Sequence, residues 1–132
     1  MIVRPMSSED IPQLAGLYKQ FWGEDSCIDR MKSKFEKFEE SGSHILLSAV
    51  EGNRLVGSVM GVICEELYGD CKPFLVLENM IVDKDYRQRG IGSALLKELE
   101  RRAAGQCSQI ILVTEAKRMD ACKFYESAGY TG

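Results

Sequence analysis

The sequence of 132 residues is poor in metal ligands: it has a single histidine, His44, and no Cys-x-x-Cys pair. Both shortages argue against a zinc site, which draws on Cys and His at short spacings. The five cysteines are an odd number, which favours reduced intracellular thiols over a disulfide framework. No apolar run approaches the roughly 18 residues of a membrane span, and Met1–Pro5 does not resemble a signal peptide. We therefore expect a cytoplasmic protein without a metal and without a membrane partner.

The sequence also lacks an excess of positive charge. Its 17 Lys and Arg residues against 20 Asp and Glu residues give a net charge of −3. Because nucleic-acid-binding domains are typically basic, we expect no nucleic-acid partner. Apolar residues make up 45% and charged residues 28%, which is ordinary for a globular domain. The length suffices for one hydrophobic core, so residues 1–132 are expected to form a single domain.

Hydrophobic periodicity predicts an α/β protein with a mixed sheet. Expected helices cover 11–22, 28–40, 90–104 and 118–128, and expected strands cover 1–5, 45–50, 55–63, 74–82 and 109–114. Residues Ser7 and Ser26 are expected to cap the first two helices, with Ile28 on the apolar face of the second. The strand at 109–114 is almost wholly apolar, which predicts burial on both faces. Strand 74–82, helix 90–104 and strand 109–114 are expected to form one right-handed βαβ unit.

The stretch from Glu78 to Leu99 combines a buried strand, a polar turn and a helix that begins with two glycines. A helix start presents unpaired N–H groups and partial positive charge, and Gly90 and Gly92 let an anion approach the backbone closely. Arg87 and Arg89 add cationic side chains. These features favour a phosphate site over glycines that only make a tight turn.

Two common nucleotide motifs are absent from this turn. A P-loop requires Gly-x-x-x-x-Gly-Lys-Ser/Thr, which the sequence does not contain. A dinucleotide fingerprint requires a third Gly or Ala where this sequence has Leu95, and a first Gly directly after the strand. Seven residues separate Val82 from Gly90. A nucleotide-binding regulator is therefore disfavoured.

The turn instead resembles the Gln/Arg-x-x-Gly-x-Gly/Ala signature of the GNAT N-acetyltransferase superfamily, which Arg87, Gly90 and Gly92 match. The segments LENMIVDKDYRQRGIGSALL at 77–96 and ACKFYESAGY at 121–130 are also similar to that family. The resemblance implies a GNAT-like fold, with a mixed antiparallel and parallel sheet flanked by about four helices. It implies acetyl-CoA as co-substrate, with no metal, and a primary amine as acceptor, on a small molecule or on a protein lysine or N-terminus.

The resemblance also implies which residues contact acetyl-CoA. The pyrophosphate would bind at the glycine turn, and the tetrahedral oxyanion would meet a backbone N–H around Asn79–Ile81, where the strand of the family bulges. The cofactor-binding residues implied in this way are Met80, Ile81, Val82, Arg87, Gln88, Arg89, Gly90, Ile91, Gly92, Ser93 and Arg118. Arg118 replaces an Asn that family members often carry; it either contacts a phosphate or is a solvated residue at a helix start.

Glu78 is the candidate general base. An amine with a pKa of about 10.4 is almost wholly protonated at pH 7, so a proton acceptor is needed, through a water molecule. Glu78 lies in an otherwise apolar strand, where burial is expected to raise its pKa. The structural alternative is a glutamate neutralised by an arginine such as Arg54 or by backbone groups.

Tyr125 matches the tyrosine that the family places beside the thioester sulfur, where a phenol donates to the leaving thiolate. The alternative is a tyrosine that only packs the last helix. Together, Glu78 and Tyr125 favour an enzyme that transfers acetyl directly to an amine, over a non-catalytic acyl-CoA-binding sensor.

The acceptor pocket is expected to involve the first two helices, the turn at 52–54 and the loop at 65–73. Three acids in that loop, Glu65, Glu66 and Asp70, hint at a cationic acceptor, although a solvated acidic loop is the simpler interpretation. The family has one or two strands beyond the position of Gly132. The sequence is therefore expected to lack the last strand, or to receive one from a partner such as a second copy in a homodimer.

Overall fold

The computed structural model describes residues 1–112 of the chain. Within this part, five strands form one sheet in the order β1-β2-β3-β4-β5. Their bounds are Ile2–Pro5 for β1, His44–Glu51 for β2, Arg54–Cys64 for β3, Phe74–Val82 for β4 and Ile110–Leu112 for β5. The first four strands pair antiparallel with their neighbours, and β5 pairs parallel with β4. The predicted mixed sheet is confirmed.

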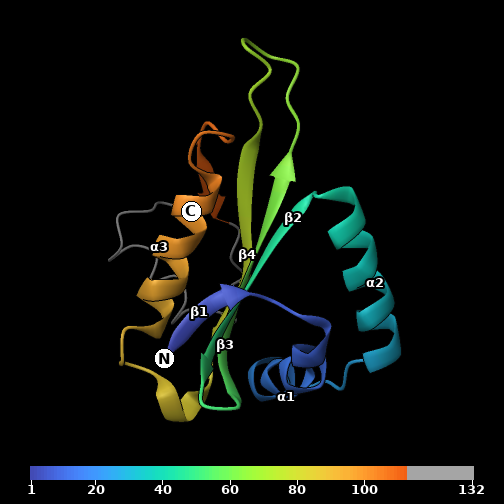
Figure 1. Ribbon diagram of the computed structural model, residues 1–132, viewed down its shortest axis with the longest axis vertical. Coiled ribbons are helices and arrows are strands. Elements are labelled where there is room, and N and C mark those ends of the chain that lie inside the picture. Colours follow the sequence, from blue (N-terminus) through green and yellow to red (C-terminus); the bar gives the residue numbers. More distant parts are fainter. Residues whose placement is uncertain (113–132) are drawn as a thin grey trace.

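Helices cover both faces of the sheet (Figure 1). Helices α1, Ile11–Trp22, and α2, Ile28–Ser41, lie on one face, and α3, Ile91–Ala103, lies on the other. Two short 3-10 turns, η1 at Ser8–Asp10 and η2 at Lys84–Tyr86, precede α1 and α3. The fourth expected helix, 118–128, lies outside the described residues. No helix in the described part combines the length and the apolar character needed to cross a membrane.

Each face of the sheet has its own hydrophobic core, as expected for a sheet between helices. The core under α3 is built around the fully buried Leu77, Leu95 and Leu99. The core under α1 and α2 contains Leu14 and Phe35. Side chains alternate between these cores along each strand, which fixes the face to which every strand residue points.

Most helix ends agree with the sequence prediction. Gly23 and Gly42 follow α1 and α2 with φ of 78° and 66°, the left-handed conformation that favours glycine at a helix end. The expected Ser26 cap is wrong, because Cys27 is the N-cap of α2 and makes no side-chain capping bond. Ile28 was expected on the buried face, but its first-turn position leaves it 38% exposed.

The strand β5 also departs from expectation. Ile111 is 38% exposed, whereas burial on both faces was predicted. Among the described residues, β5 is the end strand of the sheet, so Ile111 has a neighbouring strand, β4, on one side only. An apolar sequence indicated the strand correctly but not its place in the sheet.

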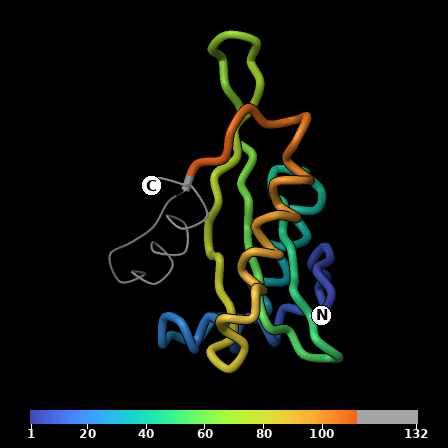
Figure 2. Tube along the Cα trace, turned by 90° about the vertical axis from the view of Figure 1, so that its left-hand side faces the viewer, coloured from blue at the N-terminus to red at the C-terminus, as the bar shows by residue number. Residues whose placement is uncertain are grey.

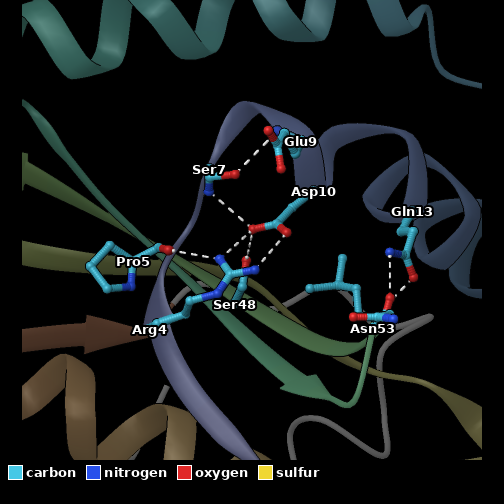
Figure 3. A network of polar contacts seen from close by, with 9 residues as sticks. Arg4, Pro5, Ser7, Glu9, Asp10, Gln13, Ser48 and Asn53 are labelled. Carbon is cyan, nitrogen blue, oxygen red and sulfur yellow. Dashed lines mark hydrogen bonds and ion pairs between the residues drawn. The ribbon is translucent and has the colours of Figure 1, made fainter.

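The carboxylate of Asp10 joins β1, η1 and β2 (Figure 3). It accepts two hydrogen bonds from Arg4, at 2.8 and 2.9 Å, one from the Ser7 N–H at 3.0 Å and one from the Ser48 hydroxyl at 2.9 Å. Burial raises the pKa of Asp10, but the hydrogen bonds from Arg4, Ser7 and Ser48 outweigh it and hold the pKa below its usual value. Ionised Asp10 therefore stabilises the start of α1 against the sheet.

We predict that Asp10→Asn lowers the free energy of unfolding by about 1–3 kcal/mol at pH 7, because it leaves buried donors poorly paired. The contribution of Asp10 is complete above the unfolded pKa of about 3.9 and is lost as the pH falls through the lower folded pKa. Urea unfolding of both proteins between pH 7 and pH 3 measures the difference, which should shrink at the acid end.

The control for this prediction is Ser48→Ala, which removes one of the hydrogen bonds to Asp10 and should cost less than Asp10→Asn. Equal unfolding free energies for the wild type and Asp10→Asn at pH 7 would contradict the proposed role of this carboxylate.

Candidate active site

Glu78 lies in the middle of β4, opposite Met60 of β3. Its neighbour Leu77 belongs to the core under α3, so Glu78 points to the opposite face, the side of α1 and α2. The described pairing of β4 with β5 covers Leu75, Val76 and Leu77 and so reaches the residue before Glu78. The side chain is half-buried rather than enclosed, so the expected deep burial is not found.

A β-bulge follows Glu78 directly. On β3 the paired residues advance from Ser58 to Met60, while on β4 they run from Glu78 to Ile81, which inserts one extra residue into β4. Asn79 has a φ of 52°, an uncommon conformation that Asn tolerates better than most residues. The predicted bulge at Asn79–Ile81 is confirmed, and it changes the direction of the backbone beside Glu78.

Arg54 is not the partner of Glu78. Its guanidinium lies 2.9 Å from Asp83 and 3.8 Å from Asp85, which rules out the neutralised pair with Glu78 that the sequence left open. Glu78 acts electrostatically on His44 of β2. Burial lowers the pKa of His44, and the negative charge of Glu78 opposes that shift. The imidazole stacks on Phe38 with ring centroids 3.7 Å apart.

Asp83 holds the turn that follows β4. Its carboxylate is 3% exposed and accepts hydrogen bonds from Arg54 at 2.9 Å, from the Asp85 N–H at 2.9 Å and from Gln20 of α1 at 3.4 Å. Burial raises the pKa of Asp83, but these hydrogen bonds and the charge of Arg54 outweigh it and lower the pKa overall. Gln20 also accepts from the Lys84 N–H at 3.2 Å, so α1 is joined to the turn at two points.

The helix α3 begins without a side-chain cap. Gly90 is its N-cap with a φ of 79°, and Gln88 before it has a φ of 63°. No atom lies within 4 Å of the place where a Cβ on Gly90 would stand, so the approach to the backbone is open among the described residues. Free N–H groups, the helix dipole and this opening suit an anion.

The residues predicted to bind the cofactor divide into two groups. The side chains of Met80, Ile81 and Ile91 are at most 6% exposed and pack in the cores, as Val82 partly does, so only their backbone groups are available to a ligand. Polar side chains and glycines of the turn form the other group: Arg87, Gln88, Arg89, Gly90 and Ser93 are exposed, and Gly92 is half-buried. Tyr125 and Arg118 lie outside the described residues.

The expected acceptor pocket is corrected by the length of β3. The turn at 52–53 and the loop at 65–73 lie at opposite ends of this strand of 11 residues, roughly 35 Å apart at 3.3 Å per residue (Figures 1 and 2). They therefore cannot line one pocket. The turn lies beside Asp83, whereas the loop extends away from the rest of the described chain.

Three residues at the turn after β4 escaped the sequence analysis: Asp83 and Tyr86 within the turn, and Gln20, which contacts it from α1. The sequence Asp83-Lys84-Asp85 after an apolar strand is a pattern typical of an Asx turn and offered a signal for Asp83. The positions of Gln20 and Tyr86 depend on tertiary contacts, which local patterns do not reveal.

A cavity of about 380 Å³ lies away from this site. Its lining includes Phe35 and Phe38 of α2 and His44 of β2. Arg102 and Gln106, at the C-terminal end of α3 and just after it, also line the cavity. The N-terminal turn of α3 does not contribute to it.

Comparison with known proteins identifies the family to which this fold and glycine turn belong. Residues 11–130 match the model of the acetyltransferase (GNAT) family. Because this match spans most of the sequence, the chain belongs to the GNAT acetyltransferase family.

Individual proteins are similar to this chain in sequence or in fold. An uncharacterized Bacillus subtilis protein, YdhI, is 36% identical over 76 residues, which are 56% of this chain and 44% of that protein. The chain spans less than half the length of the first curated relatives that it matches. A solved structure of a putative acetyltransferase from Agrobacterium tumefaciens has a TM-score of 0.87 at 22% identity and covers 99% of this chain and 93% of its own. The aminoglycoside N-acetyltransferase AAC(6')-Iy in complex with CoA has a TM-score of 0.84 at 20% identity, over 99% and 88% of the two chains. These two structures show a shared fold.

Gly57 lets β3 pack against the first residue of α3. A Cβ at this position would lie 3.0 Å from Ile91 Cγ2 and 3.2 Å from the Ile81 carbonyl oxygen. We predict that Gly57→Ala lowers the free energy of unfolding by about 1–3 kcal/mol through overpacking, measured by urea denaturation.

The matched control is Gly16→Ala in α1, where no atom lies within 4 Å of the added Cβ. It should raise stability by about 0.5–1 kcal/mol, because alanine favours a helix. If Gly57→Ala is as stable as the wild type, close packing does not explain this glycine.

Proposed function

We propose that the chain binds acetyl-CoA at the N-terminus of α3 and transfers the acetyl group to a primary amine. The observation that carries the proposal is the uncapped, glycine-started helix beside Arg87 and Arg89 in a chain of the GNAT family. The CoA complex of a protein with the same fold supports this choice of co-substrate. The thioester supplies an activated acetyl group, and the residues of the chain bind, orient and deprotonate.

The turn fits a pyrophosphate in three respects. Gly90 leaves the backbone open, the first N–H groups of α3 have no side-chain cap, and exposed guanidinium groups lie on the approach. Arg87 donates to the Val82 carbonyl at 3.4 Å, which keeps its side chain near the end of β4. A phosphate at this position gains both charge and directional hydrogen bonds.

Glu78 is proposed as the general base, acting through water on the protonated amine. Its half-buried position leaves access for water, and the bulge after it redirects the backbone next to the carboxylate. The backbone N–H groups of Asn79–Ile81 are proposed to stabilise the oxyanion. Sequence resemblance supports two further roles: Tyr125 as donor to the leaving thiolate and Arg118 as a phosphate contact.

The acceptor is proposed to reach Glu78 from the face of α1 and α2, to which the carboxylate points. Glu78 pairs with Met60 between the two ends of β3, and the acids of the loop at 65–73 lie past the end of that strand, so they do not define the charge of the acceptor. The site therefore suits acceptors that carry an amine which Glu78 can deprotonate.

We predict that acetyl-CoA raises the melting temperature of the wild type and that Gly90→Asp abolishes the shift. At a ligand concentration 100 times the Kd, the stabilisation is about 2.7 kcal/mol, which corresponds to several degrees for a domain of this size. Aspartate places a side chain and a negative charge where the phosphate would bind. Differential scanning fluorimetry with and without acetyl-CoA measures both proteins.

The matched control is Gly69→Asp, at a glycine with a φ of 61° and equally open surroundings in the distant loop. It should retain the full shift. A wild type whose melting temperature does not move at saturating acetyl-CoA would refute the proposed cofactor.

Glu78→Gln preserves shape and removes the basic oxygen. We expect kcat/KM to fall roughly 10²–10⁴-fold at neutral pH, the usual range for a general base. Much of the loss should be recovered at high pH, where the amine is already neutral. Steady-state rates with a panel of amines from pH 7 to pH 10 measure this profile.

Glu36→Gln on the exposed side of α2 is the control and should behave as the wild type. Full activity of Glu78→Gln at pH 7 would assign the proton to another group or to bulk water. Tight acetyl-CoA binding without turnover of any amine would favour a non-catalytic sensor.

A further inference from the structure

Two guanidinium groups lie against the ring of Tyr86. The Cζ atom of Arg54 is 5.1 Å from the ring centroid, and that of Arg89 is 4.9 Å from it. Both distances are within the roughly 6 Å over which an aromatic ring attracts a cation. Tyr86 is half-buried and packs against the core under α3, and its N–H donates to the Asp83 carbonyl at 2.9 Å, which fixes its backbone relative to the end of β4.

The two cations are not equivalent. The positive charge of Arg54 is offset by nearby carboxylates, since its guanidinium lies 2.9 Å from Asp83 and 3.8 Å from Asp85. Arg89 forms no ion pair with any carboxylate among residues 1–112. The carboxylates that pair with Arg54 reduce the electrostatic repulsion between the guanidinium groups of Arg54 and Arg89. Arg89 therefore keeps its charge free while the ring holds its side chain.

The backbone of Arg89 lies next to the start of α3. It comes directly before Gly90, the N-cap of α3, and thus adjoins the N–H groups proposed to bind pyrophosphate. An exposed arginine loses side-chain entropy when a ligand immobilises it. Contact with Tyr86 in the free protein reduces the part of this cost that remains at binding.

We infer that Tyr86 is a positioning residue of the cofactor site, which places the guanidinium of Arg89 beside the N-terminus of α3. Arg54, fixed by Asp83, supports the ring on which Arg89 rests. This inference rests on the proposed acetyl-CoA site and adds to it a residue that need not touch the ligand.

The test is the affinity for coenzyme A, measured by titration calorimetry on four proteins: wild type, Tyr86→Leu, Arg89→Ala and the double variant. Tyr86→Leu should weaken binding about 2–5-fold, the size of an exposed cation–π contact. Arg89→Ala should weaken it about tenfold through the lost charge. In the double variant, Tyr86→Leu should add nothing to Arg89→Ala, because the ring acts only through Arg89.

Three further variants separate positioning from simple packing. Tyr86→Phe keeps the ring and should bind as the wild type, and Tyr68→Leu, at an 85% exposed tyrosine in the distant loop, should also leave the affinity unchanged. Arg89→Lys keeps the charge on an exposed side chain but loses the planar group, and should weaken binding about 2–5-fold. This last variant tests the contact even if Tyr86→Leu does not fold.

The outcomes distinguish this inference from the function on which it rests. Wild-type protein that does not bind coenzyme A overturns the proposed cofactor and the role of Tyr86 together. Normal wild-type binding with unchanged affinity in Tyr86→Leu or Arg89→Lys, or with independent effects in the double variant, overturns the role of Tyr86 alone.

Discussion

The buried carboxylate of Asp83 is the constraint on which the candidate site depends. It accepts hydrogen bonds from Arg54 at the start of β3, from Gln20 on α1 and from the backbone of its own turn. A buried carboxylate is costly unless it is paired and hydrogen-bonded, so the three segments must stay together as long as Asp83 is ionised. The turn that leads to α3 is therefore tied to both the sheet and the opposite helical layer.

The strand β4 combines core residues with the proposed general base, and a bulge follows that base directly. Leu75 and Leu77 are fully buried under α3, and regular alternation would continue this pattern along the strand. One extra residue with Asn79 in the left-handed region interrupts the alternation immediately after Glu78. Glu78 points to the face of α1 and α2 by alternation with Leu77, and after the bulge the strand resumes its packing at Met80 and Ile81, one in each core. The Glu78 carboxylate is half-buried at this point of an otherwise apolar strand.

Local patterns in the sequence predicted the elements, since periodicity, glycine ends and turn residues are short-range signals. They located β4 from Phe74 to Val82 and the glycine start of α3. Properties that depend on neighbours far along the sequence were missed or misjudged. Ile111 was expected to be buried but is 38% exposed, and Glu78 was expected to be buried but is half-buried. The expected acceptor pocket combined a turn and a loop that lie at opposite ends of β3. The partner of Arg54 is Asp83, 29 positions away, which no local rule indicates.

The electrostatics of the turn follow from the same pairings. The whole chain carries a net charge of −3, so its average field does not attract an anion. A phosphate site in such a protein needs local positive charge that neighbouring acids do not cancel. Asp83 and Asp85 are close to the glycine turn, and Arg54, which lies near both, offsets one of their two negative charges. Arg89 forms no ion pair within the described residues, and the N-terminus of α3 has no side-chain cap. Arg54 therefore contributes to the charge balance of the glycine turn, although it lies at the start of β3.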